Sequence, residues 1–358
     1  MIYKQSVFEP WPIESGSIQA ICTSPPYFAL RKYDIQDIVI GGNKDCKHEF
    51  NNEIIERKRG NVSGPTAQCG VQKSGICGTH INHGSFCIHC NAWLGQYGLE
   101  PTPQMYVEHT RLWAKEAWRV LRNDGVFFLN LADSYGTTSG SMGKGKWKDP
   151  KLSDEQNASM PEKPVLNMHK CQLLIPHRVA IALVDAGWTL RNTIVWHKPN
   201  AMPESVTDRF SKKYEYIFMF TKQEKYCFDL DEVREKCSSV NKLRDRNSEL
   251  SNNGYIGDRF SKGERSEQHP LGKNPGDIWS IPTQPSSEKH FAMWPERLVE
   301  RMIKCSTRAR DMVLDPFCGS GTTLKVAEQL HRKGIGIDLG YHEMSKRRTG
   351  KIQKEMFT

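Results

Sequence analysis

A serine, two prolines and a tyrosine stand together directly after a short apolar run near the start of the chain. The run "SIQAIC" is typical of a buried strand, and Ser24, Pro25, Pro26 and Tyr27 follow it in "CTSPPYF". Proline fixes φ and has no N–H group to donate, so the pair must end the strand in a rigid corner. Such a corner keeps a hydroxyl, two carbonyls and an aromatic ring at fixed relative positions. We expect it to grip something flat and polar, the alternative being a plain proline turn after a strand.

A second candidate site lies in the stretch "DMVLDPFCGSGTTLKVAEQLHRKGIGIDL". Its pattern predicts a strand over 312–314, a loop of small residues, a helix over 322–331 and a second strand. Asp315 ends the first strand and Asp338 ends the second, 19 positions after Gly319. The glycines of the loop allow close backbone approach to a ligand, and the second acid can accept hydrogen bonds from ribose hydroxyls.

The residues after these glycines narrow the choice of ligand. A dinucleotide site usually carries a third glycine, whereas Thr322 and Thr323 follow Gly321 here. A cofactor with an adenosine and a charged amino-acid tail fits better, with Asp315 near its ammonium group. The alternative is a tight strand-to-helix turn that holds no ligand.

A Cys/His pair and a Cys-x-x-Cys knuckle flank a polar stretch that has little from which to build a core. Cys46 and His48 stand in "CKHEF", and Cys87 and Cys90 stand in "CIHC". This is the ligand set of a tetrahedral zinc site, and a metal would supply the order that apolar burial cannot. The rival ligands in the same stretch are Cys69, Cys77, His80, His83 and His89. The alternative is a polar surface insertion with incidental thiols.

Length and charge limit the class of protein. The chain has 358 residues, enough for one large domain or two ordinary ones, and its formal charge of +9 favours a polyanionic partner. The sequence shows no apolar run long enough to span a membrane and no secretory signal pattern, so we expect a cytoplasmic protein without a membrane partner. The 11 cysteines are then expected to be reduced thiols or metal ligands.

Further helices and strands must hold these sites in place. The pattern predicts an amphipathic helix over 108–121 and a second helix over 175–186. The apolar face of the first is expected to consist of Leu112, Ala117, Trp118 and Leu121. "GVFFLNL" and "TLRNTIVWH" are expected to be strands, "YEYIFMFTK" a hairpin strand at the edge of the sheet, and 136–163 a loop. These elements predict an α/β fold with a mostly parallel sheet and helices on both faces.

The two candidate sites, taken in this order, resemble a known family. "TSPPY" followed far downstream by "DPFCGSGTT" is similar to the DNA amino-methyltransferases, which transfer a methyl group from S-adenosylmethionine to the exocyclic nitrogen of cytosine or adenine. The order, catalytic motif first and cofactor motif last, resembles the permuted class called beta. "LRNDGVFFLNLADSY", "DAGWTLRNTIVWHKPNAMPES" and "KHFAMWPERLVERMI" resemble further parts of the family in the expected order, and the whole is similar to methylases of phages and prophages. The resemblance implies a Rossmann-like S-adenosylmethionine-dependent methyltransferase fold.

The resemblance also implies a role for each site residue. Ser24 Oγ and the Pro25 carbonyl would accept the two N–H bonds of the amine, and Pro26 would help to fix the corner. Tyr27 would stack on a base flipped out of the duplex, and Asp338 would hold the ribose. The methionine side of the cofactor would be lined by Asp315, Phe317, Cys318, Gly319, Ser320, Gly321 and Thr322, with Phe291 or Trp294 packed against it.

The implied organisation has a catalytic, a metal-binding, a DNA-reading and a cofactor-binding part. The catalytic part consists of residues 1–40 and 99–224, and the metal-binding part of residues 41–98. The DNA-reading part consists of residues 225–281, and the cofactor-binding part of residues 282–358. Asn200 and Arg209 are weaker candidates for contact with DNA.

The implied partner is double-stranded DNA in a bacterial or phage-infected cell, and a restriction-modification role allows a homodimer and a cognate restriction nuclease. We place cytosine N4 slightly ahead of adenine N6, because a serine at this position is commoner among the cytosine enzymes of the family. Two other classes stay open. One is a methyltransferase acting on RNA or on a protein amide, and the other is a zinc-stabilised DNA-binding module without catalysis.

Overall fold

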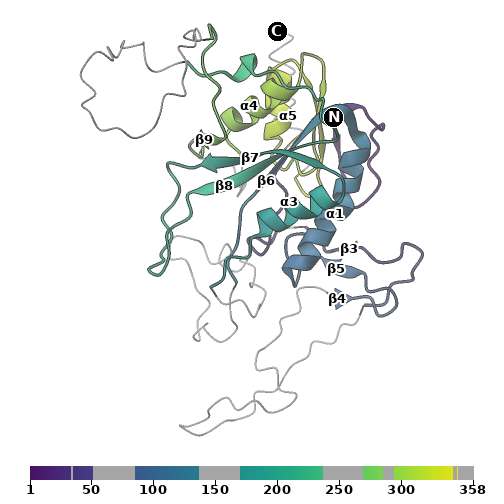
Figure 1. The fold of residues 1–358 in the computed structure, drawn as a ribbon. Coiled ribbons are helices and arrows are strands. Elements are labelled where there is room, and N and C mark those ends of the chain that lie inside the picture. Colours follow the sequence, from purple (N-terminus) through teal and green to yellow (C-terminus); the bar gives the residue numbers. More distant parts are fainter. Residues whose placement is uncertain are drawn as a thin grey trace, which may run out of the picture.

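One large, mostly parallel sheet forms the centre of the protein (Figure 1). The computed structural model describes residues 1–33, 35–50, 85–136, 170–236, 269–284, 294–341 and 345. Within them, eight strands lie in the order β1-β11-β10-β2-β6-β8-β7-β9. They are β1 (Ile2–Tyr3), β2 (Ile18–Thr23), β6 (Leu121–Leu131), β7 (Thr189–His197), β8 (Tyr214–Thr221), β9 (Ile278–Ser280), β10 (Met312–Asp315) and β11 (Lys333–Ile337). Every neighbouring pair is parallel except the two that involve β8, which confirms the expected sheet.

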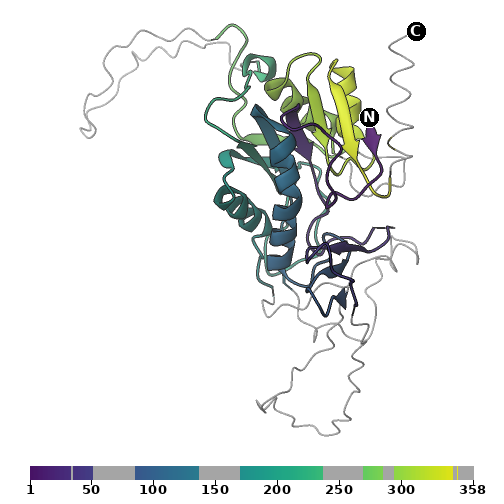
Figure 2. The same ribbon diagram turned by 90° about the vertical axis from the view of Figure 1, so that its right-hand side faces the viewer.

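Helices cover both faces of this sheet, as expected. In Figure 1 the sheet runs between α4 (Glu296–Ser306) and α5 (Thr322–Gln329) on one side and α1 (Pro103–Val120) and α3 (Ile175–Asp185) on the other; Figure 2 shows the same layers after a quarter turn. Successive side chains of a strand point to opposite faces. Phe127 of β6 accordingly packs in the core under α1 and α3, and Phe128 packs in the core under α4 and α5.

Helix α1 begins five residues before the predicted start, and of its predicted apolar face Ala117 is buried and Trp118 packs against the core. Thr102 caps it, since the Thr102 side chain accepts a hydrogen bond from the Met105 amide at 3.2 Å, and a proline occupies the first turn. The placement of Leu112 on the apolar face was wrong, because its side chain is 37% exposed while its neighbour Trp113 is fully buried. Leu121 leaves the helix and opens β6.

Strand β8 lies inside the sheet, so its predicted place at the edge was wrong. It pairs with β6 on one side and with β7 on the other, and Phe218, Met219 and Phe220 are all buried. A run buried on both faces is typical of an interior strand. The edge is formed by β9, from within 225–281, which pairs in parallel with β7.

A small antiparallel sheet lies beside α1. Its strands are β3 (Ile38–Ile40), β4 (Ser85–Phe86) and β5 (Trp93–Gly95), in the order β3-β5-β4 (Figure 1). Ile40 and Trp93 belong to the core that also contains α1, and the Trp93 ring stacks on His109 of α1 with 5.6 Å between ring centroids. Part of the segment 41–98 is therefore built into the main domain.

Some expectations fall outside the described residues. These are the loop over 136–163 beyond residue 136, the middle of the segment 225–281, and Phe291. In the part of the chain that is described, no helix has both the length and the apolar character needed to cross a membrane.

Candidate active site

Two cavities meet at Ser24, at the carboxyl end of β2. The first cavity is lined from segments 5–8, 24–38, 96–97, 315–323 and 337–341. The second is lined mainly from segments 24–33, 196–204, 212–215 and 283–284. Ser24, Tyr33 and Trp294 line both. The two cavities therefore adjoin at the Ser24 side chain.

Asp315 joins the first cavity to the serine corner. Its carboxylate accepts hydrogen bonds from Thr23 Oγ1 at 2.7 Å, from Thr323 Oγ1 at 2.6 Å and from the Phe317 amide at 3.0 Å. Burial raises the pKa of Asp315 to about 6, and Asp338 adds to this rise, while the hydrogen bonds from Thr323 and Thr23 oppose it. The predicted strand end thus holds a buried acid with a raised pKa in the cavity wall.

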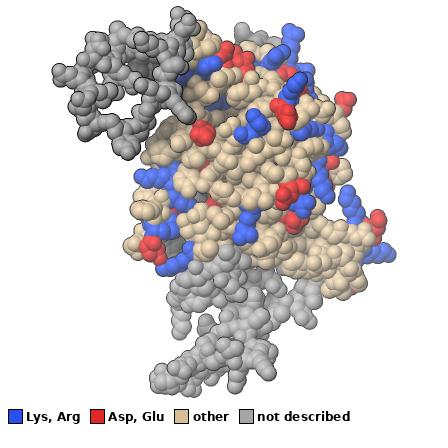
Figure 3. All heavy atoms as spheres, viewed as in Figure 1, with Lys and Arg blue, Asp and Glu red and all other residues tan. Residues whose placement is uncertain are grey.

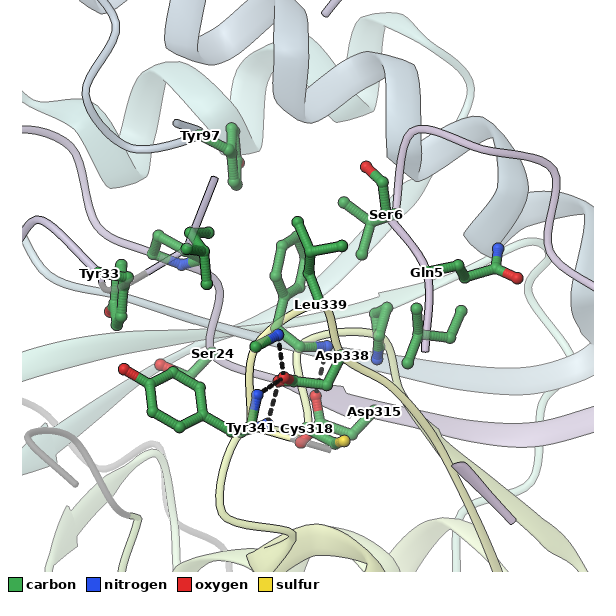
Figure 4. A pocket seen from close by; sticks show the side chains of 18 of the residues that line it. Gln5, Ser6, Ser24, Tyr33, Tyr97, Asp315, Cys318, Asp338, Leu339 and Tyr341 are labelled. Atoms are coloured by element: carbon green, nitrogen blue, oxygen red, sulfur yellow. Dashed lines mark hydrogen bonds between the residues drawn. The ribbon is translucent and has the colours of Figure 1, made fainter. Parts of the chain in front are cut away.

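Asp338 lies in the middle of the cavity wall shown in Figure 4. It accepts hydrogen bonds from the Gly319 amide on Oδ2 and from the Gly340 amide on Oδ1, both at 2.9 Å, and from the Tyr341 amide. The acid at the end of β11 therefore holds the glycine loop after β10 in place. This contact with the loop was not predicted, and the expected contact of Asp338 with a ribose stays a prediction.

The loop after β10 supplies most of the other predicted residues of the first cavity. Its lining members are Phe317, Cys318, Gly319, Ser320 and Thr322. Gly321 does not line the cavity: its φ is +78°, and a Cβ there would overlap the Ser345 hydroxyl, so the position requires glycine. Trp294 lines both cavities, and Phe291 lies outside the described residues.

Two further parts of the lining of the first cavity were not predicted. One contains Tyr33, Gln96 and Tyr97, and others come from residues 5–8 and Leu339. Tyr97 stacks on Phe317 of the glycine loop with 5.7 Å between ring centroids, and Figure 4 shows Tyr97 and Tyr33 on the side away from Gln5. These residues come from loops whose sequence has no strong local pattern, so only the folded arrangement identifies them.

A polar network backs the serine corner in the second cavity. Ser24 Oγ lies 3.0 Å from Tyr27 Oη, which lies 2.7 Å from Glu215 Oε2. Asn130 Nδ2 donates to the same carboxylate oxygen at 2.6 Å and also to Tyr27, and Lys198 forms an ion pair with the other oxygen. Burial, and then the charge of Glu215, raise the pKa of Tyr27 well above its ordinary value, so its hydroxyl keeps its proton.

The direction of these hydrogen bonds defines what Ser24 can do. Tyr27 donates its one proton to the Glu215 carboxylate, so its oxygen accepts the proton of Ser24. Ser24 Oγ then faces both cavities as a hydrogen-bond acceptor. The Pro26 carbonyl is occupied by Tyr106 Oη at 2.9 Å. The stacking of Tyr27 on a base stays a prediction. The Tyr27 hydroxyl links Ser24 to Glu215.

Three residues of the network were missed from the sequence. Asn130 and Glu215 are single polar residues within the apolar runs "FFLNL" and "YEYIFMF", and Lys198 follows the strand β7. A lone polar residue in a core strand is a usable signal, because burial without a partner is costly.

The β7–β8 hairpin forms the outer side of the second cavity. Asn200 lines the cavity and exchanges hydrogen bonds of 2.8 and 2.9 Å with the backbone of Thr283. Arg209 forms an ion pair of 2.6 Å with Glu204 and does not itself line the cavity. Phe210 is 97% exposed. Lys and Arg side chains gather over this hairpin at the left of Figure 3.

The four predicted metal ligands come together beside the small sheet. The ligand atoms of Cys46, His48, Cys87 and Cys90 all lie within 4.8 Å of one another. His89 instead points to Glu49 at 3.3 Å, with its side chain 51% exposed. The rival ligands Cys69, Cys77, His80 and His83 lie outside the described residues. Three sulfur atoms and one imidazole nitrogen suit a structural zinc ion.

Comparison with known proteins gives consistent matches along the chain. The family model N6_N4_Mtase, described as DNA methylase, matches residues 18–347. The Type II methyltransferase M.XycI of Xanthomonas campestris pv. cyanopsidis is 31% identical over 329 residues, 91% of this chain and 79% of that protein. The Type II methyltransferase M.Cfr9I of Citrobacter freundii is 32% identical over 327 residues, which are 91% of this chain and 79% of that protein. The solved PvuII DNA methyltransferase (cytosine-N4-specific) has a similar fold, with a TM-score of 0.55, 18% identity, and coverage of 99% of this chain and 89% of that one.

Proposed function

The chain belongs to the DNA methylase family and is an S-adenosylmethionine-dependent DNA methyltransferase, and we propose that its target is the N4 amine of a cytosine flipped out of the duplex. Adenine N6 is the alternative. The observation that carries the proposal is the position of Ser24, which lies between the two cavities and faces both as an acceptor. A hydroxyl is the acceptor that the resembling cytosine enzymes commonly place here.

We assign the first cavity to the cofactor. When bound, S-adenosylmethionine supplies an activated methyl group on a sulfonium. Asp315 would contact its ammonium group, Asp338 its ribose, and Trp294 would close the side toward the second cavity. The hydrogen bond between Asp338 and Gly319 would keep the loop at the shape the cofactor requires.

We assign the second cavity to the base. The lone pair of an exocyclic amine is delocalised into the ring, so the enzyme must hold the N–H bonds and aim the nitrogen at the methyl carbon. Ser24 Oγ would accept one N–H and the Pro25 carbonyl the other, which fixes the direction of attack. Such positioning and electrostatic stabilisation account for most of the rate in reactions of this kind.

The network behind Ser24 offers a destination for the proton that the amine must lose. S-adenosylmethionine would supply the methyl group, and methylation would leave the amine nitrogen positively charged. The nitrogen then carries one proton too many. Ser24 Oγ and Tyr27 Oη form a continuous hydrogen-bonded path from the amine to Glu215. We propose that Glu215 receives this proton and that Lys198 balances the carboxylate charge before transfer.

The hairpin beside the second cavity is our candidate for contact with double-stranded DNA. Its basic residues suit phosphate, and the exposed ring of Phe210 suits stacking or insertion where the base has left the helix. The Type II names of the relatives suggest a cognate restriction nuclease as a counterpart, and a bacterial or phage-infected cytoplasm as the place where DNA is met.

Mass spectrometry of the methylated nucleoside tests the proposed base. Purified protein, S-adenosylmethionine and DNA are incubated, and the DNA is digested to nucleosides. We expect N4-methylcytosine, and less of it with Ser24→Ala at the same protein concentration and reaction time. N6-methyladenine alone would refute the cytosine assignment, and 5-methylcytosine would overturn the whole mechanism.

A further inference from the structure

The spacing within the Cys/His cluster matches that of ligands around one metal ion. Cys46 Sγ and Cys87 Sγ are 3.8 Å apart, and Cys90 Sγ is 3.4 Å from His48 Nδ1. Two sulfur ligands of a tetrahedral zinc ion stand about 3.8 Å apart, and a sulfur and a nitrogen ligand about 3.6 Å apart, given the usual bond lengths. A disulfide would require about 2.05 Å. The cluster therefore has the dimensions of a metal centre. The distance between the sulfur atoms of Cys46 and Cys87 is too long for a disulfide bond.

The backbone around the cluster is shaped to bring its two halves together. Cys87 begins a tight turn in which its amide donates to the Ala92 carbonyl at 2.8 Å and its carbonyl accepts from the Asn91 amide at 2.9 Å. Gly42, with φ of +72°, precedes the segment that carries Cys46 and His48. It allows the backbone to approach Cys90 closely, since a Cβ at this position would lie 2.8 Å from Cys90 Sγ. Within the described residues, the strands of the small sheet are only two or three residues long, so they supply little apolar burial around the cluster.

The same strands lead directly into the wall of the cofactor cavity. Strand β5 follows the Cys87–Cys90 turn and is continued by Gln96 and Tyr97, which line the cavity. Gln96 Nε2 donates to the Ile35 carbonyl at 2.8 Å, and Gln96 Oε1 accepts from the Tyr33 amide at 3.2 Å. Strand β3 pairs with β5 and supplies Ile38 to the same cavity.

We propose that Cys46, His48, Cys87 and Cys90 bind one zinc ion, and that this ion holds β3 and β5 in the register that forms the cofactor wall. The wall includes Gln96, which fixes the segment that carries Tyr33 between the two cavities. Loss of the metal then loosens the wall and weakens cofactor binding, although no metal ligand touches the cofactor. The coupling, though not the metal site, rests on the proposed function.

Metal content tests the site itself. Elemental analysis of the purified full chain should give one zinc per chain, reduced to near zero by Cys87→Ser combined with Cys90→Ser. The matched control is Cys171→Ser, which removes an exposed thiol outside the cluster and should leave the zinc content unchanged. Cobalt exchanged into the wild-type chain should give the strong thiolate-to-metal absorption of a tetrahedral site. A wild-type chain grown with zinc that contains none and binds no cobalt would overturn the site, whether or not the variants fold.

Calorimetry with S-adenosylmethionine tests the coupling. Chelator-stripped wild-type protein should bind the cofactor at least about tenfold more weakly than the zinc form, within the usual range for coupled sites, and added zinc should restore the affinity. Cys171→Ser, which leaves the cluster intact, should show the same loss on stripping and the same recovery with zinc as the wild type. Unchanged cofactor affinity after loss of the metal would overturn the coupling. A zinc-loaded wild-type chain that binds no cofactor would instead overturn the proposed function and leave the metal site standing.

Discussion

The hydroxyl of Tyr27 lies 2.7 Å from the carboxylate of Glu215, across 188 residues of sequence. Tyr27 stands in the rigid corner after β2, and Glu215 is the second residue of β8. The side chain of Glu215 is only 12% exposed, and Lys198 and Asn130 occupy its remaining sides. The contact therefore ties the corner that we propose to face the base to a carboxylate that can receive a proton.

The first prediction concerns this carboxylate. Glu215→Gln keeps the shape of the side chain but cannot receive a proton, so turnover should fall by roughly 10²-fold, the lower end for loss of a general base. The affinity for S-adenosylmethionine should change little. The pH profile of turnover should also change shape. Glu224→Gln, an exposed glutamate beyond β8, is the control. Normal turnover and an unaltered pH profile in Glu215→Gln would exclude the proton path.

The second prediction concerns the serine hydroxyl. Ser24→Ala removes an acceptor for the base amine, so turnover should fall while cofactor affinity stays nearly intact. Single-turnover methylation and cofactor calorimetry measure the two effects separately. A large loss of cofactor affinity with normal turnover at saturation would show that Ser24 serves the first cavity alone.

The third prediction concerns Asp338. Asp338→Ala should weaken S-adenosylmethionine binding by about 1.5–3 kcal/mol, the scale of a hydrogen bond to a charged group. The loss includes the anchor of the Gly319 loop, so the loop should also become more accessible to hydrogen exchange. Asp185→Ala at the end of α3 is the control, because its side chain is exposed and remote in sequence from the loop. Wild-type affinity in Asp338→Ala would show that another carboxylate holds the cofactor.

The fourth prediction is a pH dependence of cofactor binding. The pKa of Asp315 is raised to about 6, so the cofactor-free protein holds a proton there below that pH. An ammonium group favours the ionised carboxylate, so binding releases the proton and affinity should rise with pH up to about 6, by at most about tenfold per unit. In the cofactor-free protein, the same raised pKa makes Asp315 stabilise the fold less as pH rises from about 4 to about 6. Calorimetry across this range should show the rise in affinity, and Asp315→Asn should lose it. A flat profile in the wild type would place the ammonium group elsewhere.

The fifth prediction concerns the hairpin. Phe210→Ala should weaken binding to a cognate DNA duplex by about 1–3 kcal/mol, the scale of stacking on a base, and leave cofactor affinity unchanged. Ile181→Ala, which removes an apolar side chain that is 62% exposed on α3, is the control for loss of exposed apolar surface. Equal DNA affinities for Phe210→Ala and the wild type would move the DNA contact away from this hairpin.

Local patterns predicted those parts of the site that are continuous in sequence. The corner at Ser24 follows a buried strand, and the loop between Asp315 and Thr322 joins a strand to a helix, so each is specified by neighbouring residues. The spacing also pointed to the four side chains that the fold brings into one Cys/His cluster, because zinc ligands are few in kind and recur at short intervals.

Contacts that depend on the pairing of distant strands could not be read in this way. Glu215 reaches Tyr27 only because β8 enters the sheet between β6 and β7, whereas the apolar run was interpreted as an edge strand. Gln96 reaches the cofactor cavity only through the pairing of β3 with β5. Periodicity states which face of a strand is buried, and it does not state which strand lies beside it.

The hydrogen bond between Thr23 and Asp315 joins residues 292 positions apart, because β2 pairs with both β6 and β10. During synthesis, β2 can meet β6 after about a third of the chain has been made, but its other neighbour is translated only near residue 312. Domains dominated by such distant pairings fold slowly, and half-formed sheets expose strand edges. A nascent chain on the ribosome therefore carries the serine corner before it carries Asp315 and Asp338, and the first cavity is completed only after the residues from 312 onward have been made.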